Sequence, residues 1–125
     1  MLPEEKTKLL ALFATPETWC QHAEAIDATG EGVSYDDDHA VAWDLSGALC
    51  KLFGWKRAHV LFEHMSRHML GVRKLPSWPP RDEGIEAMKV LQDFNDRDDM
   101  MFSHLLDNIN AMPVSNRGAR KSGSA

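Results

Sequence analysis

The sequence His39-Ala-Val-Ala-Trp-Asp-Leu-Ser-Gly-Ala-Leu-Cys-Lys-Leu-Phe-Gly54 is the stretch around which we expect the fold to be organised. Its apolar residues recur at the spacing of one face of an α-helix. These residues are Val41, Leu45, Ala48, Leu49 and Leu52. Trp43 and Phe53 extend the apolar surface beyond that face. The stretch therefore predicts a central helix that is enclosed on most sides.

The ends and one side of this predicted helix have features of their own. Asp37 or Asp38 can cap its first turn, and Gly54 suits the left-handed conformation in which many helices end. A run of small side chains leaves one side of the helix with little bulk. We therefore expect Gly47 to lie where another helix crosses closely.

Four other segments show the same helical spacing of apolar residues, namely 3–14, 55–70, 84–94 and 97–112. Asp96 stands where it can cap the last of these helices. Together with the central helix, the pattern predicts about five helices.

Residues 18–35 have two interpretations. Trp19, Ala23 and Ile26 have helical spacing, and the residue types between them favour helix. However, the turn-forming sequence Asp27-Ala-Thr-Gly-Glu-Gly32 is followed by strand-like residues, a pattern typical of a β-hairpin. These residues by themselves leave the choice open.

Length and composition indicate one soluble globular domain: the chain has 125 residues, of which 43% are hydrophobic and 26% charged. We expect this domain to span residues 1–113. Residues 114–125 are rich in Ser, Gly and basic side chains, and we expect a disordered tail. Because the tail is basic, the body is more acidic than the net charge of −5. Phosphates would be repelled by such a body, so we expect no nucleic-acid partner.

Three features of the sequence bear on the cellular compartment. Two cysteines, Cys20 and Cys50, do not make the framework of a disulfide-rich secreted domain. The N-terminal residues lack the basic and apolar segments of a signal peptide. No apolar run approaches the roughly 20 residues of a membrane-spanning helix. We therefore expect a cytoplasmic protein without a membrane partner.

Three stretches form an ordered set of motifs. They are Trp19-x-Gln21-x-Ala23-x-Ala25-x-Asp27-x-x-Gly30, then Ala40-Val-Ala-Trp43-x-x-x-Gly47-Ala48-Leu49, then Phe94-Asn95-Asp96. Together they resemble a family of small bacterial and phage-borne proteins of unknown function, which has a Trp-x-Gln segment, a Trp-Cys-x-x-Gly-Ala-Leu helix and a Trp-Asn-Asp corner. The resemblance covers residues 16–112 and implies an α+β, mostly helical domain with a small hairpin near residues 18–35. It marks structural motif positions and implies no activity; these positions are Trp19, Trp43, Gly47, Asn95 and Asp96.

Two positions depart from the family pattern. Phe94 stands in place of a Trp, which is a mild change. Asp44 stands where the family often has Cys. A Cys at the start of a helix can be activated as a nucleophile by the helix dipole, so with Asp44 there a thiol mechanism is excluded at this position.

His64, His68 and Asp44 are the candidates for chemistry. His64 and His68 lie four residues apart on one helix and are weak candidates for metal ligands, but no convincing third ligand accompanies them, so we expect no metal and no cofactor. Asp44 is a candidate general acid or base if it meets His104 or Asn95 in the fold. More often, such a carboxylate satisfies backbone donors. We expect Cys50 to be a packed small residue.

The candidate binding site is the segment from Arg73 to Pro80, where Trp78 and Pro79 follow the two cations Arg73 and Lys74. Its prolines favour an extended chain, and Trp and Arg dominate binding hot spots. Alternatively, Trp78 folds back over the groove between its neighbouring helices and belongs to the core.

From these patterns we predict a small non-catalytic protein-interaction module whose partner is another protein. The alternative is a small hydrolase or metal-dependent enzyme that uses the His64/His68 pair or an acid/base site centred on Asp44.

Overall fold

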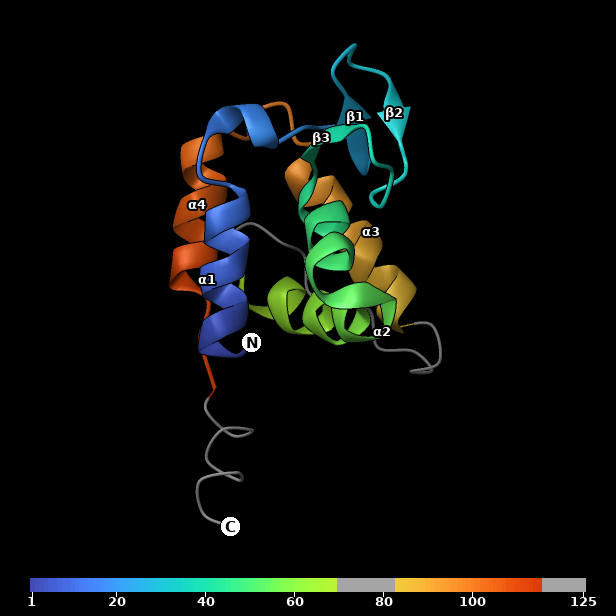
Figure 1. Cartoon of the computed structure of the whole chain (residues 1–125). Helices are drawn as coiled ribbons and strands as arrows, with labels where there is room; N and C mark the ends of the chain where they lie inside the picture. The colour runs from blue at the N-terminus through green and yellow to red at the C-terminus, as the bar shows by residue number, and fades with distance from the viewer. Residues whose placement is uncertain (70–82, 116–125) are drawn as a thin grey trace.

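The computed structural model describes residues 1–69 and 83–115. Figure 1 shows the helices and the small sheet. The elements in chain order are α1 (Pro3–Leu12), the 3-10 turn η1 (Pro16–Thr18), β1 (Ala25–Asp27), β2 (Gly32–Val33), β3 (Ala40–Trp43), α2 (Leu45–His68), α3 (Glu83–Asn95) and α4 (Phe102–Ala111). The prediction of an α+β, mostly helical protein is confirmed.

The sheet is antiparallel, with β1 in the centre between β2 and β3. The turn between β1 and β2 is built by Asp27, whose Oδ1 accepts hydrogen bonds from the backbone N–H groups of Thr29 and Glu31. Gly30 follows with φ +87°, a conformation that suits glycine. The hairpin predicted near residues 18–35 is therefore present.

The start of the central helix differs from the prediction, because residues Ala40–Trp43 form β3 and the helix begins only at Leu45. Val41, predicted in the buried stripe, has a side chain that is 46% exposed. The N-cap is Asp44, whose side chain accepts from the N–H of Gly47, and not Asp37 or Asp38. Pairing of β3 with β1 outweighs the helical spacing there.

The central helix and the next predicted helix form one element, α2, so the described residues form four helices and not about five. Gly54 interrupts α2 with φ +81° and ψ +162°, which is non-helical. Figure 1 shows the resulting sharp change of direction in the middle of α2. The glycine was predicted to end a helix; here a second helical segment follows it directly.

The last helix is shorter than predicted. It begins at Phe102 after the N-cap Met101, and the expected cap Asp96 lies in the connection after α3. Lys6 of α1 donates from its ammonium group to the backbone carbonyls of Asn110 and Met112, at the end of α4. This contact satisfies carbonyl groups that a helix end leaves free, and it holds α1 beside α4.

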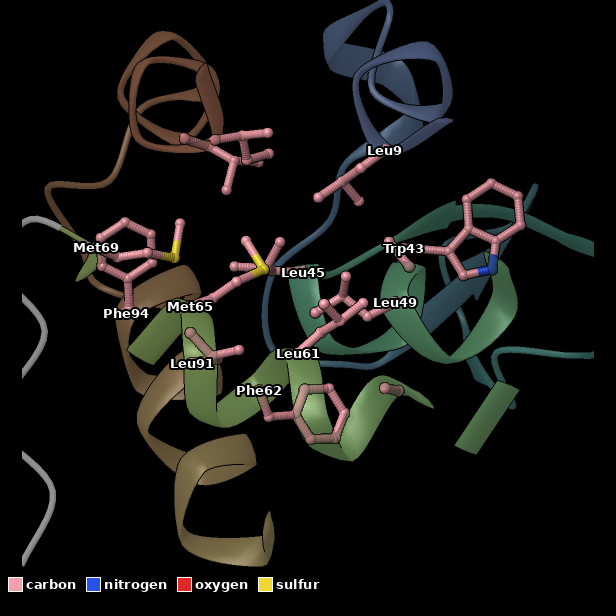
Figure 2. Packing of buried hydrophobic residues seen from close by; sticks show 14 of the residues in the cluster. Leu9, Trp43, Leu45, Leu49, Leu61, Phe62, Met65, Met69, Leu91 and Phe94 are labelled. Carbon is pink, nitrogen blue, oxygen red and sulfur yellow. The ribbon is translucent and has the colours of Figure 1, made fainter. Parts of the chain in front are cut away.

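One cluster of buried apolar side chains lies between the four helices and the sheet. Figure 2 shows part of this cluster, with Leu45, Leu49, Leu61 and Met65 of α2 near Leu91 of α3. Both segments of α2 thus contribute to the same core. In the described part of the chain, no helix is long and apolar enough to cross a membrane.

Candidate functional site

A buried asparagine joins the three sequence motifs. Asn95, at the end of α3, is 0% exposed. Its Oδ1 accepts hydrogen bonds from the Trp19 indole N–H (2.7 Å) and from the backbone N–H of Leu45 (3.1 Å). Its Nδ2 donates to the carbonyl of Cys20 (3.0 Å) and to Oδ1 of Asp96 (2.9 Å). The amide therefore uses both acceptor and both donor positions.

Three further hydrogen bonds hold the Trp19 segment to the corner after α3. The Gln21 side chain donates from Nε2 to the carbonyls of Asn95 (2.9 Å) and Arg97 (3.1 Å). Asp96 Oδ1 accepts from the backbone N–H of His22 (2.9 Å). We call the side chains of Trp19, Gln21, Asn95 and Asp96 the Asn95 network. It ties together a loop, the start of α2 and the end of α3.

His22 adopts a left-handed backbone conformation, with φ +68°. Among the described residues, His22 is the only residue other than glycine that has a positive φ. This geometry points the His22 N–H at Asp96, and the exposed imidazole Nδ1 lies 3.9 Å from Asp96 Oδ2. The strained residue thus serves the attachment of the loop to Asp96.

Asp44 caps α2 from a buried position and is only 2% exposed. Its Oδ1 accepts from the backbone N–H of Gly47 (2.6 Å) and from the Ser46 hydroxyl (2.9 Å). Burial raises the pKa of Asp44 to about 6, and the negative charges of Asp96 and Glu24 act in the same direction, against the two hydrogen bonds. The expected role of this carboxylate, satisfying backbone donors, is confirmed.

Asp44 gives a testable dependence of stability on pH. Because its folded-state pKa lies above its ordinary value of 3.8, folding favours the protonated form. The contribution of this group to stability is therefore greatest below pH 3.8, falls as the pH rises to about 6, and is constant above that. Asp44→Asn keeps a capping oxygen and removes the charge. Relative to wild type, it should gain about 2–3 kcal/mol of unfolding free energy between pH 4 and pH 7.

Urea unfolding at several pH values measures this gain. The unfolding free energy of Asp44→Ser, relative to wild type, should rise with pH as it does for Asp44→Asn. Asp44→Ala should show the same rise, but its unfolding free energy should be lower by about 1 kcal/mol at every pH because the helix cap is missing. A difference between Asp44→Asn and wild type that stays flat from pH 4 to pH 7 would contradict the raised pKa.

Gly47 lies against a peptide group. A Cβ at this position would stand 2.0 Å from the carbonyl oxygen of Glu24 and 2.9 Å from its carbon. The predicted close approach is present, but the neighbour is the chain leading into β1 and not another helix. The Glu24 carbonyl also accepts a hydrogen bond from the backbone N–H of Asp44 (3.1 Å), which fixes this carbonyl in place.

The other motif tryptophan, Trp43, ends β3. Its indole N–H donates to the carbonyl of Tyr35 (3.0 Å), and the ammonium group of Lys51 lies 4.8 Å from the centre of its ring. The backbone carbonyl of Trp43 also accepts a hydrogen bond from the backbone N–H of Cys20 (3.1 Å). Its contacts hold the sheet to the Trp19 segment.

The two cysteines are buried and free. Burial, followed by the negative charge of nearby carboxylates including Asp44, raises the pKa of both thiols to about 12. Cys50 is 5% exposed, as expected for a packed residue. At neutral pH these groups are thiols, the form that is a poor nucleophile.

The two histidines His64 and His68 lie side by side on α2. The ring centres of His64 and His68 are 5.0 Å apart, and His64 Nε2 lies 3.3 Å from the carbonyl oxygen of Pro113. Burial lowers the pKa of His64. Among the described residues, no group of three or more His, Cys, Asp or Glu could hold a metal ion.

A depression of about 330 Å³ lies beside α4, with Phe94 and Met100 among its lining residues. His104, one expected partner of Asp44, also lines this depression. Arg97 is paired with Asp99 there, at 3.0 Å. The predicted binding residues Arg73, Lys74, Trp78 and Pro79 lie outside the described residues.

The chain was compared with protein-family models, with curated proteins and with solved structures, and none of these comparisons finds a match.

Proposed function

We propose that this protein binds another protein and catalyses no reaction of its own. The observation that carries the proposal is that the side chains most suited to catalysis have structural roles. Asp44 caps a helix at 2% exposure, and Cys20 and Cys50 are buried thiols with a pKa near 12. Groups engaged in this way hold the fold and do not face a substrate.

The segment from Arg73 to Pro80 supports the choice of a protein partner. It carries two cations and Trp78 in a protein whose net charge is −5. Three prolines restrict its backbone, which lowers the entropy lost when an extended segment binds. Tryptophan and arginine are the residue types that dominate binding hot spots.

Trp78→Ala tests this proposal. It should leave the melting midpoint nearly unchanged and reduce the capture of a partner protein from a lysate of the source cell to background, since the indole is the expected anchor. Leu75→Ala, in the same segment, is the matched control for loss of an apolar side chain. If Trp78→Ala instead lowers the unfolding free energy by about 3–5 kcal/mol, as for a core aromatic, the tryptophan belongs to the core and the proposal loses this segment.

The alternative function, a small hydrolase or metal-dependent enzyme, has one observation in its favour. The pKa of Asp44 is raised to about 6, and strongly shifted carboxyl groups are common in active sites. Here the shift comes first from burial of a side chain that is 2% exposed. A general acid or base must reach its substrate, so this geometry favours the capping role.

A further inference from the structure

We propose that the depression beside α4 binds a small organic amine that has an apolar body. The inference goes beyond the proposed function and is independent of it. It rests on the shape and the charge of a site formed by the end of α3, the connection 96–101 and α4.

The depression has the form of a small ligand site. Its volume of about 330 Å³ lies at the lower end of the range for sites that hold small molecules. Its apolar lining is Phe94, which is 2% exposed, and Met100, which is 9% exposed, and both belong to the buried apolar cluster. This part of the depression is therefore fixed by the core. A ligand with an apolar body can cover it without rearrangement of the protein.

The polar lining comes partly from α4 and partly from the connection before it. His104 and Asp107 stand at i and i+3 of α4, which places them on one side of that helix. Arg97 and Asp99 line the depression from the connection. A ligand with an apolar body and one polar group can thus contact both kinds of lining.

The charges of the lining select the sign of the ligand. Arg97 and Asp99 neutralise each other, because Nε and Nη2 of the guanidinium donate to the two carboxylate oxygens, each at 3.0 Å. Asp107 is exposed and makes no hydrogen bond or ion pair within residues 1–69 and 83–115. With His104 neutral, the depression retains the negative charge of Asp107.

The surrounding chain strengthens this preference for a cation. Residues 93–107 carry five acids and one basic residue, Arg97. Such a segment produces a negative potential that attracts cations. A ligand carboxylate would meet the opposite situation, since it would compete with Asp99 for Arg97 and would be repelled by Asp107.

An organic cation fits the depression better than a metal ion. No group of three or more His, Cys, Asp or Glu in the described part of the chain could hold a metal ion. An ammonium group on an apolar body can pair with Asp107 while the body lies against Phe94 and Met100. Aromatic rings and thioether sulfur are favourable neighbours for such a ligand.

The test titrates the full chain with phenethylamine at low salt and follows its backbone amides by two-dimensional NMR. Its two comparisons have the same phenethyl body: phenethyl alcohol is neutral, and hydrocinnamate carries a carboxylate. We expect phenethylamine to shift amides within residues 94–108 with a Kd of about 1 mM, as for a ligand of this size. The alcohol should bind about threefold more weakly or worse, and hydrocinnamate more weakly still. Absence of shifts there, or hydrocinnamate binding as tightly as the amine, would overturn the inference.

Asp107→Asn locates the charge that holds the amine. It should weaken phenethylamine binding by about threefold or more, since it removes the uncompensated carboxylate from the lining. The matched control is Asp98→Asn, which changes the net charge equally at an exposed position that does not line the depression. The control should change the affinity by less than about 1.5-fold at the same salt concentration. Equal effects of the two variants would mean that no site at Asp107 holds the amine, and would contradict the inference.

Arg97→Gln should act in the opposite direction. It removes the cation of the lining and leaves Asp99 without its partner, so phenethylamine should bind about threefold more tightly. A general disturbance of the depression would not increase the affinity. Unchanged or weaker binding of phenethylamine by Arg97→Gln would contradict the assignment of a cation to this site.

Discussion

Asn95→Ala is expected to lower the free energy of unfolding by about 3–5 kcal/mol, the largest loss among single substitutions in the Asn95 network. Truncation removes the acceptor of the Trp19 indole N–H and of the Leu45 backbone N–H, together with the donor to the Cys20 carbonyl. Each of these polar groups lies in or beside the core, and a buried polar group without a partner costs about 1–3 kcal/mol.

Urea unfolding measures this loss of free energy. The m-value should stay the same as in wild type. The matched control is Asn110→Ala, at an exposed position near the end of α4, where the change should be within about 0.5 kcal/mol. A loss at Asn95 as small as that at Asn110 would show that water replaces the amide, and the network would not be a determinant of stability.

Asn95→Asp tests the contribution of the amide's donor group separately from that of its acceptor oxygen. The variant keeps an oxygen for Trp19 and Leu45 but loses the donor to Cys20, and it places a second carboxyl group beside Asp96 Oδ1. Like charges this close disfavour ionisation, so the variant should be unstable at neutral pH and recover part of its stability at low pH. Loss of stability without such recovery would assign the effect to the donor alone.

Local signals predicted most of the helices, whereas the hairpin was predicted from the resemblance, because the residues by themselves left the choice between helix and strand open. Asp27 ends β1, Gly30 lies in the turn and Gly32 begins β2, and Asp27 builds the turn with its own side chain. These interactions link residues that are two to four positions apart, so the sequence pattern carries them. The helix at the start of the chain was predicted for the same reason, with Pro3 in its first turn.

The start of α2 could not be predicted from spacing. Val41 and Leu45 stand at i and i+4, which is compatible with a helix, and the strand Ala40–Trp43 exists because it pairs with β1. Asp44 separates the strand from the helix by capping the latter. Its backbone N–H donates to the Glu24 carbonyl, a contact across 20 residues that the local sequence does not reveal.

The contacts of the candidate site, like the start of α2, depend on residues that are distant in the sequence. The motif residues Trp19, Asn95 and Asp96 were singled out by a resemblance, but their contacts join positions more than 70 residues apart. Asp96 was expected to cap the last helix, as its local sequence suggests; in the structure it accepts from His22 and Asn95 instead.

Gly47→Ala is expected to cost about 2–4 kcal/mol, although alanine is the better helix former by about 1 kcal/mol. The added Cβ would stand 2.0 Å from the Glu24 carbonyl oxygen, which is backbone and cannot rotate away. The two chains must therefore separate. Moving α2 would stretch the hydrogen bond from the Gly47 N–H to Asp44, whereas moving Glu24 would stretch the bond that its carbonyl accepts from the Asp44 N–H.

The control for this substitution is Gly32→Ala in β2, where a Cβ would meet Ala23 Cβ at 3.6 Å, an ordinary contact. It should change the unfolding free energy by less than about 1 kcal/mol, since only the backbone preference differs. Both variants are compared with wild type by urea unfolding. If Gly47→Ala unfolds at the wild-type midpoint, the Glu24 peptide is not packed against α2.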